Sequence, residues 1–224
     1  MTDKTVYIKT YKDLPINKKE ILRYAGCKGA NENIERLVDE CIEKAQPAVK
    51  SMVCYQVFDI KAMDNEIDLG FATCSSASLM KNLRGCEKII LFGATVGLEI
   101  DRLIAKYGKL SPSKGLIFQA FGTERIETLC DEFCKDISAE LNPKGEFLKP
   151  RFSPGYGDLP LNLQSDIFGS LKPQKSIGLT LNNSMLMSPS KSVTAIMGIT
   201  KEKTFCAQKD CKNCMLKDCE FRSN

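Results

Sequence analysis

The ten residues Arg151–Pro160, RFSPGYGDLP, contain two prolines and two glycines together with one arginine and one tyrosine. Proline removes a backbone donor and glycine favours turns, so this stretch continues neither a helix nor a central strand. The planar guanidinium of Arg151 suits a carboxylate, Gly155 lets backbone approach a ligand closely, and Tyr156 can stack on a ring. The stretch is therefore either a connecting loop or a clamp for a charged small molecule.

The segments on both sides of this loop carry helix and strand signals in an irregular order. Upstream, Ser111-Pro112 opens a predicted helix that ends near Leu141 and has a continuous apolar stripe. The absence of a regular βαβ alternation predicts an α+β domain with a mixed or antiparallel sheet flanked by helices. The other predicted helices are 18–24, 31–46, 75–83, 96–108 and 161–171, and the predicted strands are 49–60, 87–93, 176–181 and 192–199.

A chain of 224 residues is long enough for one sizeable core with a small appendage. The composition changes near residue 200, where a cysteine-rich segment begins. We predict an N-terminal helical extension over 1–50, a main domain over 51–200 and a small C-terminal appendage over 201–224. The loop 142–160 is long for a compact domain, and loops of that length are usually functional or disordered.

The composition excludes several classes of function. The chain has no histidine, which removes Ser-His-Asp and Cys-His nucleophile systems and every metal site that needs imidazole. A net charge of +4 without a basic block argues against nucleic-acid binding. No apolar run reaches the length of a membrane span, and the N-terminus lacks a secretory signal, so we expect a cytoplasmic protein.

The hexapeptide RFSPGY fits the pattern Arg-x-x-x-Gly-Tyr, and a long helix precedes it. A helix and the segment IGLTLNNSMLMSPSKSVTAIMGI, residues 177–199, follow it. Together these segments resemble the activation domain of cobalamin (vitamin B12)-dependent methionine synthase, in which this pattern binds S-adenosylmethionine. The resemblance covers about residues 50–200.

The resemblance implies roles for six residues. Arg151 would hold the carboxylate of S-adenosylmethionine, Gly155 and Tyr156 would complete the clamp, and backbone of Ser153 would contact the adenine. Glu127, on the long helix, and Glu146, shortly before the clamp, match two family glutamates that would pair with the ammonium or balance the sulfonium. Apart from the family, a solvated helix face is the favoured explanation of Glu127, and core packing explains Met185, Met187 and Pro189 equally well.

The resemblance also implies a partner. In that family the domain binds S-adenosylmethionine and supports the reductive methylation of cob(II)alamin, with an electron from flavodoxin or ferredoxin. This sequence contains no homocysteine, folate or cobalamin module, so it would not be catalytic alone and would contribute to methionine biosynthesis in trans. We expect it to serve a methionine synthase that lacks its own activation domain, and that synthase would carry the cobalamin. Activation of another corrinoid methyltransferase is the alternative.

Two features depart from the family. The residues GDLP follow Tyr156 where full-length synthases have Pro-Ala-Cys-Pro, and the family's N-terminal ligand-contacting aspartate has no counterpart that we can place.

Four of the eleven cysteines lie near the C-terminus, at Cys206, Cys211, Cys214 and Cys219. Their C-x4-C-x2-C-x4-C spacing provides a central chelating pair and four thiolates, a set that binds zinc or an iron–sulfur cluster. A redox-active dithiol and an unliganded tail are the alternatives, and the resemblance does not extend to this segment. With a zinc-binding tail, the whole chain is also consistent with a small regulatory or interaction module. We predict that the other seven cysteines are reduced and mostly in the core.

Overall fold

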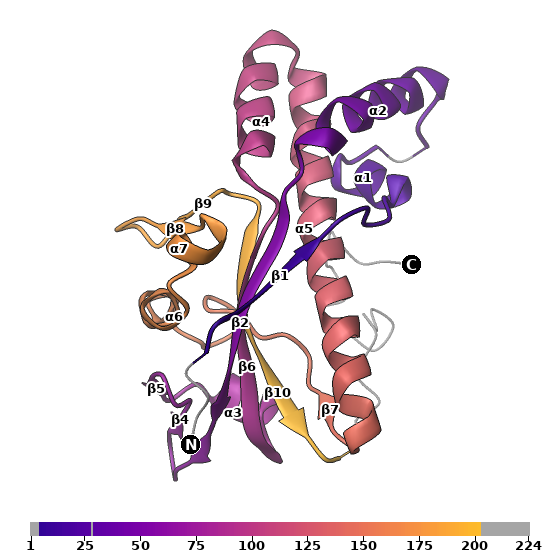
Figure 1. Ribbon diagram of the computed structural model, residues 1–224. Helices are drawn as coiled ribbons and strands as arrows, with labels where there is room; N and C mark the ends of the chain where they lie inside the picture. The colour runs from indigo at the N-terminus through magenta and orange to yellow at the C-terminus, as the bar shows by residue number, and fades with distance from the viewer. Residues whose placement is uncertain (1–4, 28, 203–224) are drawn as a thin grey trace.

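The structure, a computed structural model, describes residues 5–27 and 29–202 and has a five-stranded antiparallel sheet at its centre (Figure 1). The antiparallel sheet with flanking helices confirms the predicted α+β class. In spatial order its strands are β1 (Tyr7–Tyr11), β2 (Ser51–Asp59), β6 (Cys86–Thr95), β10 (Ser192–Thr200) and β7 (Phe147–Leu148).

The central strand β6 is buried on both faces of the sheet. From Ile89 to Thr95 every residue of this strand is buried, as expected for the apolar run EKIILFG. Because side chains alternate along a strand, Ile90 and Phe92 point to one face while Ile89 and Leu91 point to the other. The sheet therefore needs a covering layer on each side.

Helix α5 (Pro112–Leu141) covers one face of the sheet, and α1 (Lys18–Tyr24) and α2 (Glu32–Ala45) pack against α5. The longest, α5, has 30 residues and runs along the sheet (Figure 1). Its first turns pack against α4 (Leu98–Leu110), and a Cβ on Gly115 would lie 2.9 Å from the backbone of α4 at Gly108. The missing side chain at Gly115 thus allows the two helices to approach closely.

The opposite face is covered by α3 (Ala77–Asn82), α6 (Leu163–Leu171) and α7 (Pro173–Ile177). Phe152 and Leu159, from the loop predicted as a clamp, belong to the apolar cluster of this second face. Short strands complete the described structure, namely β3 (Lys61–Ala62), β4 (Ile67–Asp68), β5 (Thr73–Cys74), β8 (Thr180–Leu181) and β9 (Met187–Ser188).

The structure differs from the sequence-based assignments in several places. Strand β1 was not predicted, and it pairs along its whole length with β2, so the N-terminal segment adds an edge to the main sheet. Residues 176–181 were predicted as a strand, but Ser176 and Ile177 end α7 and only Thr180 and Leu181 are extended. Pro173 at the first position of α7 and Gly178 at its end explain this difference, because proline starts helices and glycine ends them.

Over residues 5–27 and 29–202, no helix combines the length and the apolar character that crossing a membrane requires.

The seven cysteines of the described residues are free thiols, and Cys41, Cys54 and Cys130 among them are buried. Cys206, Cys211, Cys214 and Cys219 lie outside the described residues, so the four-cysteine site stays a prediction. Within the described ranges, no group of three or more Cys, Asp or Glu side chains is placed to hold a metal ion.

Candidate functional site

The backbone of residues 149–152 runs beside strand β10 and fixes the direction of Arg151. The amide of Lys149 donates to the carbonyl of Gly198 at 2.8 Å, and Phe152 and Ile196 exchange two hydrogen bonds of 2.9 Å. Because successive residues of an extended chain point to opposite sides, Phe152 enters the second-face cluster and Arg151 points toward α5. Part of the irregular loop is thus an extension of the sheet.

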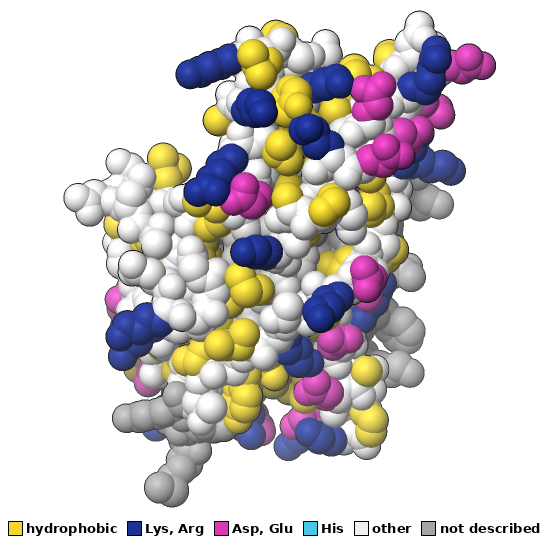
Figure 2. Space-filling model, turned by 45° about the horizontal axis from the view of Figure 1, so that its top comes forward, with side chains coloured by type: hydrophobic (Ala, Val, Ile, Leu, Met, Phe, Trp, Pro, Cys, Tyr) yellow, Lys and Arg dark blue, Asp and Glu magenta, His cyan; other side chains and the backbone are white. Residues whose placement is uncertain are grey.

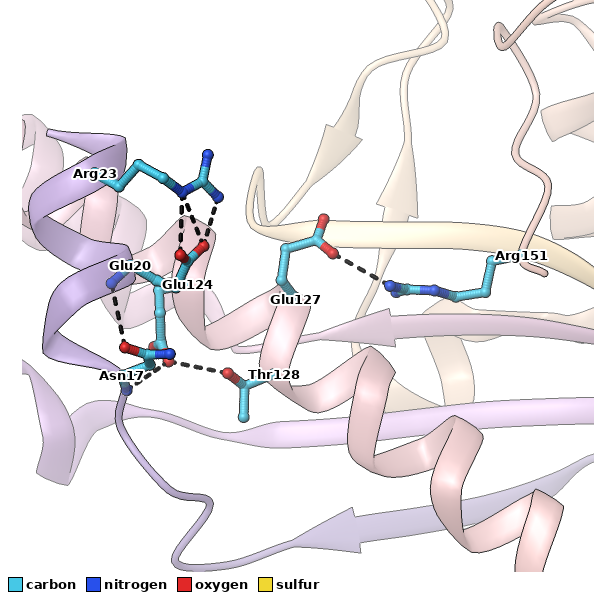
Figure 3. Close-up of polar contacts among 7 residues, drawn as sticks. All are labelled: Asn17, Glu20, Arg23, Glu124, Glu127, Thr128 and Arg151. Carbon is cyan, nitrogen blue, oxygen red and sulfur yellow. Dashed lines mark hydrogen bonds and ion pairs between the residues drawn. The ribbon is translucent and has the colours of Figure 1, made fainter. Parts of the chain in front are cut away.

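The guanidinium of Arg151 binds two carboxylates of α5. Its Nη2 lies 2.8 Å from Oδ1 of Asp131 and 3.3 Å from Oε2 of Glu127, the latter contact being drawn in Figure 3. Glu127 and Asp131 are four residues apart and so share one helix face. Among the residues that the structure describes, Nε and Nη1 of Arg151 have no hydrogen-bond acceptor, so these nitrogens can still donate to another group.

The surroundings of Arg151 keep it charged. Burial alone would lower the pKa of the guanidinium, but neighbouring anionic groups (Cys130 when ionised, Glu127 and Asp131) raise it above its ordinary value. Burial raises the pKa of the Cys130 thiol to about 12 and that of Cys134 to about 11. Both thiols are therefore neutral near pH 7, and the two carboxylates provide the negative charge around Arg151.

Two grooves lie along α5 next to these carboxylates. One has a volume of about 430 Å³ and includes Glu127 in its wall, and the other has a volume of about 470 Å³ and includes Asp131. Both volumes fall in the range of small-molecule sites. The first groove is lined by Tyr24, Gln119, Ala120, Thr123 and Glu127.

The second half of the predicted clamp, residues 153–159, forms a compact turn. The amide of Tyr156 donates to the carbonyl of Ser153 at 3.1 Å, and the amide of Gly155 donates to the carbonyl of Leu159 at 2.9 Å. Gly155 has φ +85°, a conformation that strongly favours glycine. The ring of Tyr156 meets Phe152 edge-on at 5.7 Å and is 65% exposed, which leaves it accessible to a ligand or a partner.

Asp158 ties this turn to α3 on the second face of the sheet. Its carboxylate accepts hydrogen bonds from the Ser76 hydroxyl at 2.5 Å, the Ala77 amide at 2.8 Å and the Ser78 amide at 3.1 Å. The hydrogen bond from Ser76, supported by those from Ser78 and Ala77, lowers the pKa of Asp158 to about 2. The segment GDLP, which departs from the family pattern, thus provides a helix cap in this chain.

The structure brings together some of the residues predicted for the site. Arg151 and Glu127 are in contact, while Ser153, Gly155 and Tyr156 form the neighbouring turn. Glu146 lies elsewhere, because its amide bonds the carbonyl of Leu141 at the end of α5, and the fourteen residues from Glu127 to Leu141 span about 21 Å of helix. The proposed ligand contacts of these residues stay predictions.

Asp131 was missed by the sequence analysis, although it makes the shorter contact to Arg151. Its position four residues after Glu127 was the available signal, since both carboxylates then lie on one helix face.

The two methionines that the resemblance includes lie in different surroundings. Met187 packs against the second-face cluster, whereas Met185 lies in a turn with φ 59°.

The chain shares its fold with a solved structure. A solved structure, the MetH reactivation domain bound to AdoHcy, superposes with a TM-score of 0.67 over 90% of this chain and 80% of that chain. The two sequences are 14% identical, so the similarity establishes the fold. No protein-family profile matches the sequence, and no curated protein matches it.

Proposed function

We propose that this chain binds S-adenosylmethionine at Arg151 and supports the reductive methylation of cob(II)alamin in a separate methionine synthase. The observation that carries the proposal is the contact between Arg151 of the RFSPGY segment and Glu127 of α5, in a fold shared with the MetH reactivation domain. The proposal keeps Gly155, Tyr156 and backbone of Ser153 as the remaining contacts, on the basis of the family pattern.

The charges around Arg151 fit the amino-acid end of S-adenosylmethionine. This end of the ligand has a carboxylate, an ammonium and a nearby sulfonium. The open nitrogens of the guanidinium can donate to the ligand carboxylate, and Glu127 and Asp131 can attract the ammonium and the sulfonium. A guanidinium that is 21% exposed interacts with a ligand more strongly than it would in bulk water.

The chemistry would take place between the bound ligand and the partner's cobalamin. Reduced flavodoxin or ferredoxin would give one electron to cob(II)alamin, forming cob(I)alamin. Cob(I)alamin would then attack the methyl carbon of the sulfonium, so that a Co–C bond forms while the C–S bond breaks. The products would be methylcobalamin and S-adenosylhomocysteine, and removal of cob(I)alamin would drive the unfavourable electron transfer. The role of this chain would be to hold and present the methyl donor.

Titration calorimetry with S-adenosylmethionine tests the binding step. Arg151→Ala should weaken affinity on the order of ten- to hundredfold, because a charge-assisted hydrogen bond contributes about 1.5–3 kcal/mol. Arg102→Ala is a matched control, since Arg102 pairs with a carboxylate as Arg151 does but lies on α4, where its side chain is 65% exposed. Equal affinities for wild type and Arg151→Ala would remove Arg151 from the site, and no binding by wild type would reject the proposal.

A further inference from the structure

A second cationic side chain, Lys191, lies against α5 just before β10. The segment that carries it is held firmly, because the carboxylate of Asp101 accepts from the Ser190 amide at 2.7 Å and the Ser190 hydroxyl at 2.6 Å. The carbonyl of Lys191 accepts from the amide of Val96 at 3.2 Å. These contacts place Lys191 between α4 and α5.

The side chain of Lys191 is buried to an unusual degree for lysine. Only 8% of the residue is exposed. Its aliphatic part crosses α5 at Gly122, where an added Cβ would lie 2.9 Å from Cγ of Lys191 and 2.8 Å from Cγ2 of Ile100. The glycine therefore leaves the space that the lysine side chain occupies against the helix on its way to Thr123.

The ammonium of Lys191 has a hydroxyl as its hydrogen-bond partner. Nζ donates to Oγ1 of Thr123 at 2.9 Å, and that hydroxyl in turn donates to the carbonyl of Gln119 at 3.0 Å. Over residues 5–27 and 29–202, no carboxylate lies within ion-pair distance of Nζ. Asp101 attracts it from farther away while bonded to Ser190. Burial lowers the pKa of Lys191, which reflects the cost of a buried charge without a counter-ion.

The hydroxyl that accepts from the ammonium belongs to Thr123, which lies in the wall of the groove of about 430 Å³ along α5. Gln119 and Thr123, which link the ammonium to the groove, both line this space, and so does Glu127 one helical turn farther along. Farther along the helix, Arg151 contacts both Glu127 and Asp131. Two cationic side chains therefore lie along the same helix, on either side of one carboxylate.

We propose that Lys191 and Thr123 form a binding subsite for an oxyanion, a carboxylate or phosphate group, at the Thr123 end of this groove. The oxyanion would accept from the ammonium and supply the counter-ion that the described residues lack. Under the proposed function, S-adenosylmethionine has one carboxylate and Arg151 binds it, so this subsite takes a different anionic group. The subsite itself does not depend on that function.

Side-chain NMR of the full-length protein tests the subsite, with inorganic phosphate and acetate as probes. In protein carrying ¹³C-labelled lysine, the Cε signal of Lys191 is assigned by its absence from Lys191→Met. We expect this signal to shift saturably with a dissociation constant on the order of 10 mM, as a single charge-assisted contact provides, relative to sodium chloride at equal ionic strength. An unchanged signal with both probes overturns the proposal.

Thermal unfolding gives a second measurement that does not depend on assignment. Phosphate should raise the melting temperature of wild type above that in sodium chloride, and Lys191→Met should lose this increase. Lys175→Met, which removes an exposed lysine on α7, should keep it. Methionine preserves the packing on Gly122, so Lys191→Met is expected to fold. An equal phosphate effect in Lys191→Met would overturn the proposal.

Calorimetry with S-adenosylmethionine separates this inference from the proposed function. Lys191→Met should bind S-adenosylmethionine within about threefold of wild type, because the subsite serves another group. A loss of tenfold or more would place Lys191 in the S-adenosylmethionine site and overturn the separate subsite. If wild type responds to phosphate but not to S-adenosylmethionine, the inference stands and the proposed function fails.

Discussion

Asp158 is an exposed residue whose carboxylate stabilises the start of a helix on another part of the chain. It accepts from the hydroxyl of Ser76 and from the amides of Ala77 and Ser78, which begin α3. The amide groups at the start of a helix have no partner within the helix, and the helix dipole favours a negative charge there. The carboxylate of Asp158 therefore attaches the turn that contains Gly155 and Tyr156 to α3, and the ionisation of this carboxylate depends on pH.

This dependence gives a prediction about pH. The pKa of Asp158 is lowered to about 2 in the folded protein from an ordinary value of 3.8, so its contribution to stability is complete above about pH 4. It is lost as the pH falls through about 2. Asp158→Ala should thus lower the melting temperature at pH 7, and the difference from wild type should shrink between pH 4 and pH 2.

The control is Asp64→Ala, which removes an exposed carboxylate between β3 and β4. This variant should melt within about 1 °C of wild type at pH 7, as surface substitutions usually have small effects. A constant difference between wild type and Asp158→Ala from pH 7 to pH 2 would contradict the assigned role of the Asp158 charge.

Arg151 and Glu127 could be predicted from the sequence because each lies in a local sequence pattern that indicates its position in the fold. Arg151 stands in a rigid Pro- and Gly-rich stretch, and Glu127 stands at the edge of a helical apolar stripe. The contributions of Asp131 and Asp158 could not be predicted in the same way. Each depends on a contact between segments about twenty or more residues apart, set by the pairing of residues 149–152 with β10 and the packing of the turn on α3.

At the scale of elements, a buried ion pair attaches the N-terminal segment to α5. The side chain of Arg125 is 2% exposed and donates to the carboxylate of Glu124 and to the carbonyls of Leu14 and Pro15. Glu124 also accepts from the amide of Asn17 and the hydroxyl of Thr128, as Figure 3 shows. These contacts place the entry to α1 beside α5, so the segment between β1 and α1 is part of the folded domain.

Removing Arg125 should therefore destabilise the whole domain. Arg125→Met leaves the carboxylate of Glu124 buried without its cation and leaves two carbonyls without a donor. We expect a loss of about 3–5 kcal/mol in the free energy of unfolding, measured by urea denaturation. The double variant Glu124→Gln/Arg125→Met should lose less than Arg125→Met. The control Arg102→Met, from an exposed pair, should change stability by less than about 1 kcal/mol. A similarly small change in Arg125→Met would contradict the structural role of the pair.

Most of the longer helices and strands were predicted, because their apolar periodicity and caps are local features of the sequence. Asn31 and Ser76 cap α2 and α3, and the 30-residue helix α5 begins at Pro112 as predicted. Strand β1 could not be predicted in this way, because its sequence YIKTY has two charged or polar residues among five and a burial pattern that is largely exposed. Its identity as a strand depends on pairing with β2, more than forty residues away.

At the scale of the whole molecule, the face shown in Figure 2 does not gather charge of one sign into a patch. On the face shown in Figure 2, Lys and Arg side chains are spread among Asp, Glu and neutral side chains. This distribution agrees with the small net charge of +4. Proteins that bind nucleic acids usually gather basic side chains into a patch or stripe, so the face in Figure 2 gives no support for that function.

The four C-terminal cysteines lead to a prediction about the metal content of the purified protein. Protein purified without air or chelator should contain either stoichiometric zinc or a brown chromophore with iron and sulfide, bound by Cys206, Cys211, Cys214 and Cys219. Replacing Cys211 and Cys214 by Ser should remove the metal, because these two form the central chelating pair. Replacing Cys41, which is buried on α2, by Ser should not. Metal-free wild-type protein under these conditions would contradict the four-thiolate site.

The last prediction concerns the partner in the proposed function. Because the cobalt must also meet other methyl donors and acceptors during turnover, contact with this chain should be transient, with an interface at the low end of the usual size range. A host of this protein should therefore encode a methionine synthase without its own activation domain. Mixing its cob(II)alamin form with a low-potential reductant, S-adenosylmethionine and this protein should produce methylcobalamin, which absorbance detects.

Each component should be required for methylcobalamin to form. Arg151→Ala should slow the reaction at subsaturating S-adenosylmethionine by the same ten- to hundredfold as it weakens binding, and Arg102→Ala should leave the rate unchanged. A different corrinoid methyltransferase that is methylated faster than the synthase would identify the partner as that protein. If cobalamin recovers equally fast when this chain is left out, the activating role is wrong, even where calorimetry shows that S-adenosylmethionine binds, because binding alone would then have no effect on the cobalt.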